Sequence, residues 1–311
     1  MRKKQIDKLT SMKTDFELKG KEKYVKVFDG CELRTLTFDN QSEPYEDVEI
    51  LFIPGLLTVF PRWEKVVKEL NEHYTVHYIE SREKITSKLV KKATMKIPEM
   101  MKDLDCIEKS LGLNEKKYIT ISSSMGGSLI LENLAAKTLR PIGSILISPG
   151  VEVIFPKAVP KILHIMPAFV FTIMKPYIRW HLKHRTVDAE KEPEQLKQYT
   201  RAILEADFKK MRKVVIRNAN KYNGWHLLPK IMNRIILIGA STDKAHSSEF
   251  SRKVSNALSN CTYVDLGTNK AAHDTPLVKL AEEFIKELTN TGPKITERIF
   301  TYEEAQKLVG Q

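Results

Sequence analysis

A regular alternation of short apolar runs with longer helix-patterned segments constrains the fold of this chain more than any other feature. The apolar runs, rich in β-branched and aromatic residues, lie at 48–55, 74–80, 116–122 and 141–149. The segments between them with apolar residues at helical spacing lie at 62–70, 98–113 and 128–139. Consecutive strands that are joined through helices pair in parallel. The alternation therefore predicts an α/β fold with a mostly parallel central sheet flanked by helices.

The alternation stops near residue 150 and resumes with the apolar run at 233–240. A helix pattern, a further strand pattern and a last helix pattern follow, at 247–259, 261–267 and 276–288. The residues in between read as helices interrupted by prolines. We therefore predict a core formed by residues 1–150 and 231–311, with a helical cap inserted at residues 151–230. Those inserted residues are called the cap segment below.

The stretch ITISSSMGGSLI, residues 119–130, breaks a strand pattern with three serines and two glycines before a helix pattern begins. A nucleophile on a sharp strand-to-helix turn needs small residues two positions before and two positions after it. Ser124 has Ser122 and Gly126 at these positions, whereas Ser123 would place Met125 at the crowded later one. Ser124 is therefore the predicted nucleophile, and Ser122 and Ser123 are expected to be dispensable.

The sequence SSSMGG resembles the nucleophile elbow of the α/β-hydrolase superfamily, GxSxG, with Ser122 in place of the first glycine. In that superfamily the acid and the histidine follow the serine in this order. The resemblance implies Asp243 as the acid, just past the strand pattern at 233–240, and His273 as the base, in the loop before the last helix. Glu152 is the alternative acid, because some relatives take the acid from the preceding strand end.

A tetrahedral intermediate on such a serine needs backbone N–H donors around its oxyanion. The resemblance implies the amide of Met125, immediately after the nucleophile, as one donor. It implies the amide of Leu56 as the other, in the turn after the strand pattern at 48–55. Relatives commonly carry His-Gly where this chain carries Pro54-Gly55, and this difference removes a side chain but leaves the amide in place.

A serine nucleophile forms an acyl-enzyme that water resolves, and this chemistry suits esters, thioesters and amides. We therefore expect a serine hydrolase that cleaves a carboxylic ester of an apolar acyl group, of the carboxylesterase, lysophospholipase or monoacylglycerol lipase type. An acyltransferase with the same triad and a non-catalytic hydrolase-fold binding protein are the alternatives. The sequence implies no cofactor and no metal. The oligomeric state of the protein stays open, as do the acyl chain length and the head group of its substrate.

The net charge of +12 is concentrated in the cap segment, which has 16 Lys and Arg against 7 Asp and Glu. A basic block of this kind suits nucleic acid, an anionic membrane or an anionic ligand, or it is a solvated face. Because the resemblance points to a small ester or lipid-like substrate, we expect no nucleic-acid partner and consider peripheral contact with an anionic membrane. The charged amino-terminal residues 1–23 lack the apolar run of a signal peptide, so we expect a cytoplasmic protein.

Overall fold

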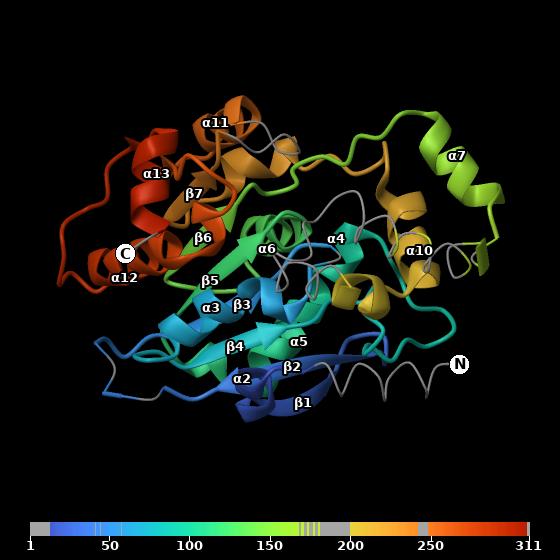
Figure 1. Ribbon diagram of the computed structural model, residues 1–311, viewed down its shortest axis with the longest axis horizontal. Helices are drawn as coiled ribbons and strands as arrows, with labels where there is room; N and C mark the ends of the chain where they lie inside the picture. The colour runs from blue at the N-terminus through green and yellow to red at the C-terminus, as the bar shows by residue number, and fades with distance from the viewer. Residues whose placement is uncertain are drawn as a thin grey trace.

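The computed structural model describes residues 13–40, 42–43, 45–56, 58–167, 169–170, 173, 177, 180, 200–241 and 248–309. In this part of the chain a nine-stranded sheet runs through the centre of the molecule, in the order β1-β2-β4-β3-β5-β6-β7-β8-β9 (Figure 1). The strands are β1 (Lys21–Lys26), β2 (Glu32–Phe38), β3 (Glu49–Ile53), β4 (Val76–Ile79), β5 (Tyr118–Ser123), β6 (Gly143–Ile147), β7 (Ile235–Gly239), β8 (Cys261–Asp265) and β9 (Arg298–Ile299).

The sheet is mostly parallel, because β1 and β2 pair antiparallel, β2 pairs antiparallel with β4, and the remaining neighbours from β4 to β9 are parallel. The antiparallel hairpin turns at Gly30, whose φ of 83° lies in the left-handed region that glycine adopts without strain. The predicted fold class, an α/β fold with a mostly parallel sheet flanked by helices, is confirmed.

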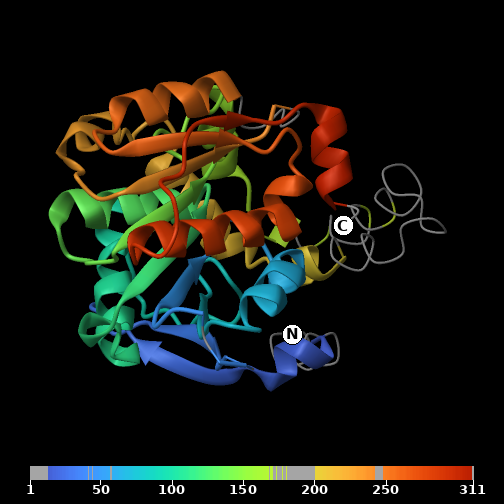
Figure 2. The same cartoon turned by 90° about the vertical axis from the view of Figure 1, so that its left-hand side faces the viewer.

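Helices cover both faces of the sheet (Figures 1 and 2). One face packs against α3 (Phe60–Leu70) and α12 (Thr275–Leu288). The other packs against α4 (Ile97–Met100), α5 (Lys102–Leu111), α6 (Met125–Ala136) and α11 (Ser248–Ala257). The central strands are buried throughout, as expected for parallel strands covered on both sides. A short α2 (Asp15–Lys19) precedes the sheet, and α13 (Tyr302–Val309) follows it.

The described residues between β6 and β7 contain α7 (Ala158–Ile165), α10 (Phe208–Asn218) and a 3₁₀ helix, η3 (Trp225–Lys230). The two ends of this segment run beside each other and form a stem. Glu152 and Asn223 form an antiparallel bridge, and the Asn220 amide donates to the Val153 carbonyl at 2.7 Å. The segment therefore leaves the core and returns to it at one place.

The parallel pairing places the carboxyl ends of β3, β5, β6, β7 and β8 at the same edge of the sheet. The register pairs Ile53 with Ser122 and Ser123 with Ile147, so the turns after β3, β5 and β6 meet there. In open α/β sheets, ligands bind outside the carboxyl ends of the strands. This edge is where the candidate active site lies.

Candidate active site

Ser124 occupies a strained turn between β5 and α6. Its φ of 46° and ψ of −115° are uncommon for a residue with a side chain, and strain of this kind persists only where the surroundings fix it. The Ser124 amide donates to the Ile147 carbonyl at 3.0 Å, and its carbonyl accepts from the Gly150 amide at 3.0 Å. The strand ends on either side thus hold the turn in place.

The glycine after the turn is required by close backbone packing. A Cβ on Gly126 would lie 2.3 Å from the Ile53 carbonyl oxygen, a distance that no side chain tolerates. The start of α6 therefore sits directly against the end of β3. This contact brings the Ser124 turn and the loop after β3 to the same point, as the small-residue pattern around Ser124 predicts.

The three consecutive serines have different environments. Ser122 is fully buried, and its Oγ has no hydrogen-bond partner among the described residues. The Oγ of Ser123 accepts a hydrogen bond from the Gly55 amide at 2.9 Å. Ser124 lines a pocket of about 250 Å³. Ser123 lines the same pocket, but of the three serines Ser124 alone has the strained backbone that suits a nucleophile.

The pocket at Ser124 brings together residues from five strand ends. Its lining includes Leu56 after β3, Ser124 after β5, Ile147 from β6, Ala240 after β7 and His273 after β8. Two residues of the predicted triad, the serine and the histidine, are therefore in one pocket although they are far apart in the chain. The acid is not described, because Asp243 lies outside the described residues.

His273 lies in the short 3₁₀ helix η4 (Ala271–His273), and two contacts orient its ring. Its Nδ1 is 2.8 Å from the Asn269 carbonyl oxygen, and its ring stacks on the buried Trp63 of α3 with 4.2 Å between the ring centroids. A carbonyl oxygen only accepts, so Nδ1 carries the proton in this bond. In the neutral ring this places the lone pair on Nε2, which is the form that a general base requires.

Two carboxylates that could be considered as the acid of the triad, Asp274 and Glu152, have other contacts in the structure. Asp274 caps α12, accepting from the Thr275 amide at 2.7 Å and from the Lys65 ammonium. Burial alone would raise the pKa of Asp274, but these hydrogen bonds and the charge of Lys65 lower it. Glu152 belongs to the stem of the cap segment and is not part of the pocket lining. Asp274 is thus a local cap of α12.

Asp265, at the end of β8, is a buried carboxylate that the sequence analysis missed. Its Oδ1 accepts from the amides of Ser241 and Gly267 at 3.0 and 2.8 Å. Its Oδ2 accepts from the Ser241 and Tyr263 hydroxyls at 2.8 and 3.0 Å. These four bonds use both oxygens, so Asp265 joins the loops after β7 and β8. Ser241, which it holds, precedes the predicted acid by two residues.

One residue predicted to supply an oxyanion donor, Met125, follows Ser124 in the chain, and the other, Leu56, lines the same pocket as Ser124. Met125 is the first residue of α6, where backbone N–H groups have no partner within the helix. Leu56 lines the pocket, and the preceding Gly55 is tied to Ser123. A Cβ on Gly55 would lie 3.1 Å from the Ser124 Cβ, so the loop after β3 runs close to the nucleophile turn. The sequence contained no signal for the bond between Gly55 and Ser123.

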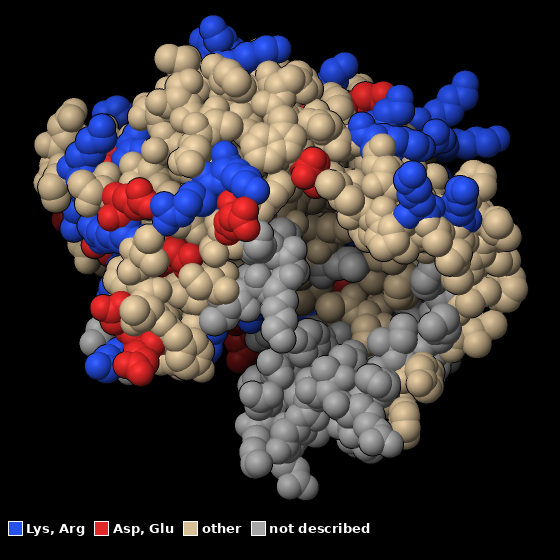
Figure 3. All heavy atoms as spheres, turned by 90° about the horizontal axis from the view of Figure 1, so that it is seen from above, with Lys and Arg blue, Asp and Glu red and all other residues tan. Residues whose placement is uncertain are grey.

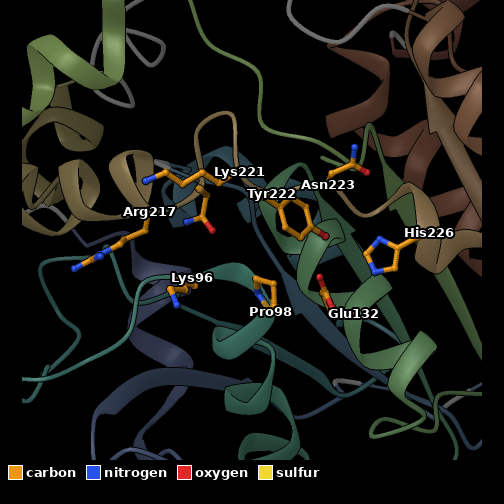
Figure 4. Close-up of a pocket in the computed structure, with 9 residues that line it drawn as sticks. Lys96, Pro98, Glu132, Arg217, Lys221, Tyr222, Asn223 and His226 are labelled. Carbon is orange, nitrogen blue, oxygen red and sulfur yellow. The ribbon is translucent and has the colours of Figure 1, made fainter. Parts of the chain in front are cut away.

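A larger cavity of about 400 Å³ lies away from these residues, at the stem of the cap segment. Figure 4 shows Glu132 of α6, Tyr222 and His226 converging on one side of it, with Lys96 and Arg217 on the other. Burial raises the pKa of Glu132, and the neighbouring Tyr222 hydroxyl, more than His226, opposes this shift. Neither Ser124 nor His273, the two triad candidates that the structure describes, lines this cavity, so its greater size does not make it the candidate active site.

Comparisons with known proteins agree with this architecture. The chain matches no protein-family model and no curated protein. A thermophilic esterase from Thermogutta terrifontis is similar in structure, with 17% identity, a TM-score of 0.65 and coverage of 86% of this chain and 99% of that chain. A membrane phospholipase A described as a bacterial virulence factor has 16% identity, a TM-score of 0.66 and coverage of 92% and 93%.

An alpha/beta hydrolase from Sphaerobacter thermophilus is similar over 85% of this chain and 100% of that chain, with 15% identity and a TM-score of 0.64. At such identities a structural likeness shows the fold and does not transfer an activity. The activity has to be argued from the residues at Ser124 and His273.

Proposed function

Because the chain has the α/β-hydrolase fold, we propose that it is a serine hydrolase that cleaves a carboxylic ester of an apolar acyl group. One observation carries the proposal: Ser124 is held on a strained strand-to-helix turn in the same pocket as His273. A strained backbone at a half-buried nucleophile in a pocket is a feature of functional sites rather than of ordinary loops. The names of similar structures, an esterase and a phospholipase, support an ester substrate but do not identify it.

In the proposed mechanism, Ser124 Oγ attacks the ester carbonyl carbon while His273 Nε2 takes its proton. The amides of Leu56 and Met125 donate to the oxyanion that forms on the carbonyl oxygen. The C–O bond to the alcohol then breaks, and the protonated histidine returns the proton to the leaving oxygen. Water attacks the acyl-enzyme by the same route and releases the acid. Asp243 would stabilise the histidinium as it forms.

The lining of the pocket supports an apolar acyl group. Leu56, Ile147, Ala240 and Ala272 contribute apolar side chains beside Ser124, and the other lining residues are polar, Arg62 among them. Small-molecule sites typically combine apolar walls with convergent polar groups. We therefore propose a lipid-like ester, of the carboxylesterase, lysophospholipase or monoacylglycerol lipase type, as the substrate class.

The experiment that tests the proposal is covalent labelling with a fluorophosphonate, followed by hydrolysis of esters of increasing chain length. We expect Ser124→Ala to abolish labelling and to reduce kcat at least 1,000-fold, on the order measured for triad serines. Ser122→Ala is the matched control, since the buried Oγ of Ser122 bonds to none of the described residues. This variant should keep both the labelling and the kcat of the wild type. Undiminished labelling of Ser124→Ala would refute the assignment, and transfer to added glycerol that outpaces hydrolysis would make the protein an acyltransferase.

A further inference from the structure

The cap segment carries a stripe of exposed apolar side chains on helical backbone. Seven of the fourteen large apolar side chains that are exposed in the described residues lie between residues 154 and 180. Six of these follow one another at intervals of three or four residues: Ile162, Ile165, Phe169, Ile173, Tyr177 and Trp180. Each has helical backbone and is more than half exposed. Phe169, Ile173, Tyr177 and Trp180 follow the end of α7, which is at Ile165, whereas Ile162 and Ile165 lie on one face of α7 itself.

This face points away from the protein core. Apolar helix faces ordinarily pack inward, but α7 has no buried residue, and Ile165 is 81% exposed. Arg212 of α10 holds the end of α7 by donating to the His164 carbonyl at 2.6 Å and to the Leu163 carbonyl. These bonds go to backbone atoms, so they fix the helix without covering its apolar side chains. A contiguous exposed apolar surface of this kind marks an interaction site.

Cations accompany the apolar stripe. Lys157 and Lys161 are exposed and lie one turn apart at α7, and exposed Lys209, Lys213 and Arg217 follow one another at intervals of four along α10. Helix α10 contains no acidic residue. Figure 3 shows Lys and Arg side chains among uncharged ones on the side of the molecule where α7 and α10 lie. Apolar side chains beside cations are the signature of helices that lie in the headgroup region of anionic membranes.

We propose that the cap segment docks on an anionic lipid bilayer, with the apolar stripe in the headgroup region and the cations of α7 and α10 against lipid phosphates. Docking is peripheral, because no helix in the described ranges is both long and apolar enough to cross a bilayer. Self-association through this face is disfavoured, since a second copy would bring like charges together. The proposal does not depend on the catalytic assignment of Ser124.

The test is sedimentation of the full chain with vesicles of phosphatidylcholine alone and of phosphatidylcholine with phosphatidylglycerol. Binding should require the anionic lipid and weaken with salt, which screens charges over about 10 Å at 0.1 M. Lys157→Gln with Lys161→Gln should weaken binding about fivefold for each lysine. Ile165→Ser with Phe169→Ser should abolish it. Neither pair should lower Tm, because these side chains are exposed in the fold.

The matched control is Lys294→Gln with Lys307→Gln, which makes the same change in net charge at exposed positions. These positions belong to the region of α12 and α13, at the opposite end of the molecule from α7 (Figure 1). It should leave sedimentation unchanged. The proposal is overturned by equal sedimentation with neutral and anionic vesicles, by no sedimentation with either, or by an equal effect of the control pair. A fall in Tm on replacing Ile165 and Phe169 would also overturn it, because these side chains would then pack within the fold. Light scattering provides the other outcome. If the wild type is a dimer that binds no vesicles, and Ile165→Ser with Phe169→Ser makes it a monomer, the face serves self-association instead.

Discussion

At the residue scale, the structure changes the role of Ser123. The sequence indicates that it is dispensable, but its Oγ accepts from the Gly55 amide at 2.9 Å and so fixes the loop that ends in Leu56. We expect Ser123→Ala to lower kcat about tenfold with little change in KM, because a misplaced oxyanion donor weakens the transition state more than substrate binding. Fluorophosphonate labelling should persist, at a lower rate.

Ser122→Ala separates this positioning effect from a general disturbance of β5. Both serines are buried in the same strand, but the Ser122 Oγ bonds to none of the described residues. If Ser123 only packs, the two variants should have the same kcat and the same Tm. A decrease in kcat confined to Ser123→Ala, with both Tm values unchanged, would show that the bond to Gly55 positions the oxyanion loop.

The contacts at the site show what a single sequence leaves out. Ser124 was identifiable because the constraint on it is local: small residues at two fixed positions and a strand and a helix on either side. The partner of Ser123 is 68 residues away, and Ser241, which donates two of the four hydrogen bonds to Asp265, is 24 residues away from it. Only the parallel register brings such residues together. Pairings of this kind have no periodic signal in the sequence.

At the element scale, long periodic segments were predicted well. The strand patterns at 116–122 and 233–240 correspond to β5 (Tyr118–Ser123) and β7 (Ile235–Gly239), and the helix pattern at 276–288 to α12. The two-residue β9 was missed, because both of its residues are exposed and a strand so short has no alternation to detect. The period of apolar residues therefore predicts the buried strands of the sheet. The edge strand β9 depends on tertiary contacts, which leave no pattern in the sequence.

Ion pairs that join the β1–β2 turn to α5 make the stability of the folded protein depend on pH. Arg82, in the turn that follows β4, donates to Asp29 in the β1–β2 turn at 2.6 and 3.0 Å and to Asp103 of α5. Burial would raise the pKa of Asp29, but the hydrogen bonds and charge of Arg82 lower it from 3.8 to about 2. The ionised Asp29 carboxylate therefore stabilises the folded state above about pH 4, and this stabilisation is lost as pH falls from 4 towards 2. Burial raises the pKa of Asp103 to about 6, so the ionisation of Asp103 has the opposite effect between pH 4 and 6.

We accordingly expect Asp29→Asn to lower Tm at pH 7 and to flatten the dependence of Tm on pH between 4 and 2. Thermal melts of the two proteins across this range measure the difference. Asp105→Asn is the control, since Asp105 pairs with Lys109 on the exposed face of α5 and such pairs contribute little. Parallel Tm curves for wild type and Asp29→Asn would mean that Arg82 does not couple this turn to α5.

At the scale of the whole molecule, a buried ionic network joins parts of the chain that are distant in sequence. Glu17 of α2 pairs with Arg34 of β2 at 3.2 Å and with Arg201 of the cap segment at 2.7 Å. Arg34 also pairs with Glu80 at 2.7 Å, and Arg201 with Glu205 at 2.5 Å. In the sequence these residues look like ordinary surface charges. The folded chain buries all five, so α2, the sheet and the cap segment share one set of charges.

Glu17 is the residue on which this network depends, because it is shared by both arginines. Removing one partner of a buried ion pair leaves an uncompensated charge and typically costs about 3–5 kcal/mol, so Glu17→Gln should lower the free energy of unfolding by about that amount. Glu22→Gln is the matched control. Glu22 also pairs with Arg34, at 2.6 Å, but its side chain is 38% exposed, so its loss should cost about 1 kcal/mol or less. Urea unfolding at pH 7 measures both values. Equal costs would mean that solvent reaches the network, whereas a large cost confined to Glu17→Gln, together with increased proteolysis near residue 201, would show that these charges hold the cap segment to the core.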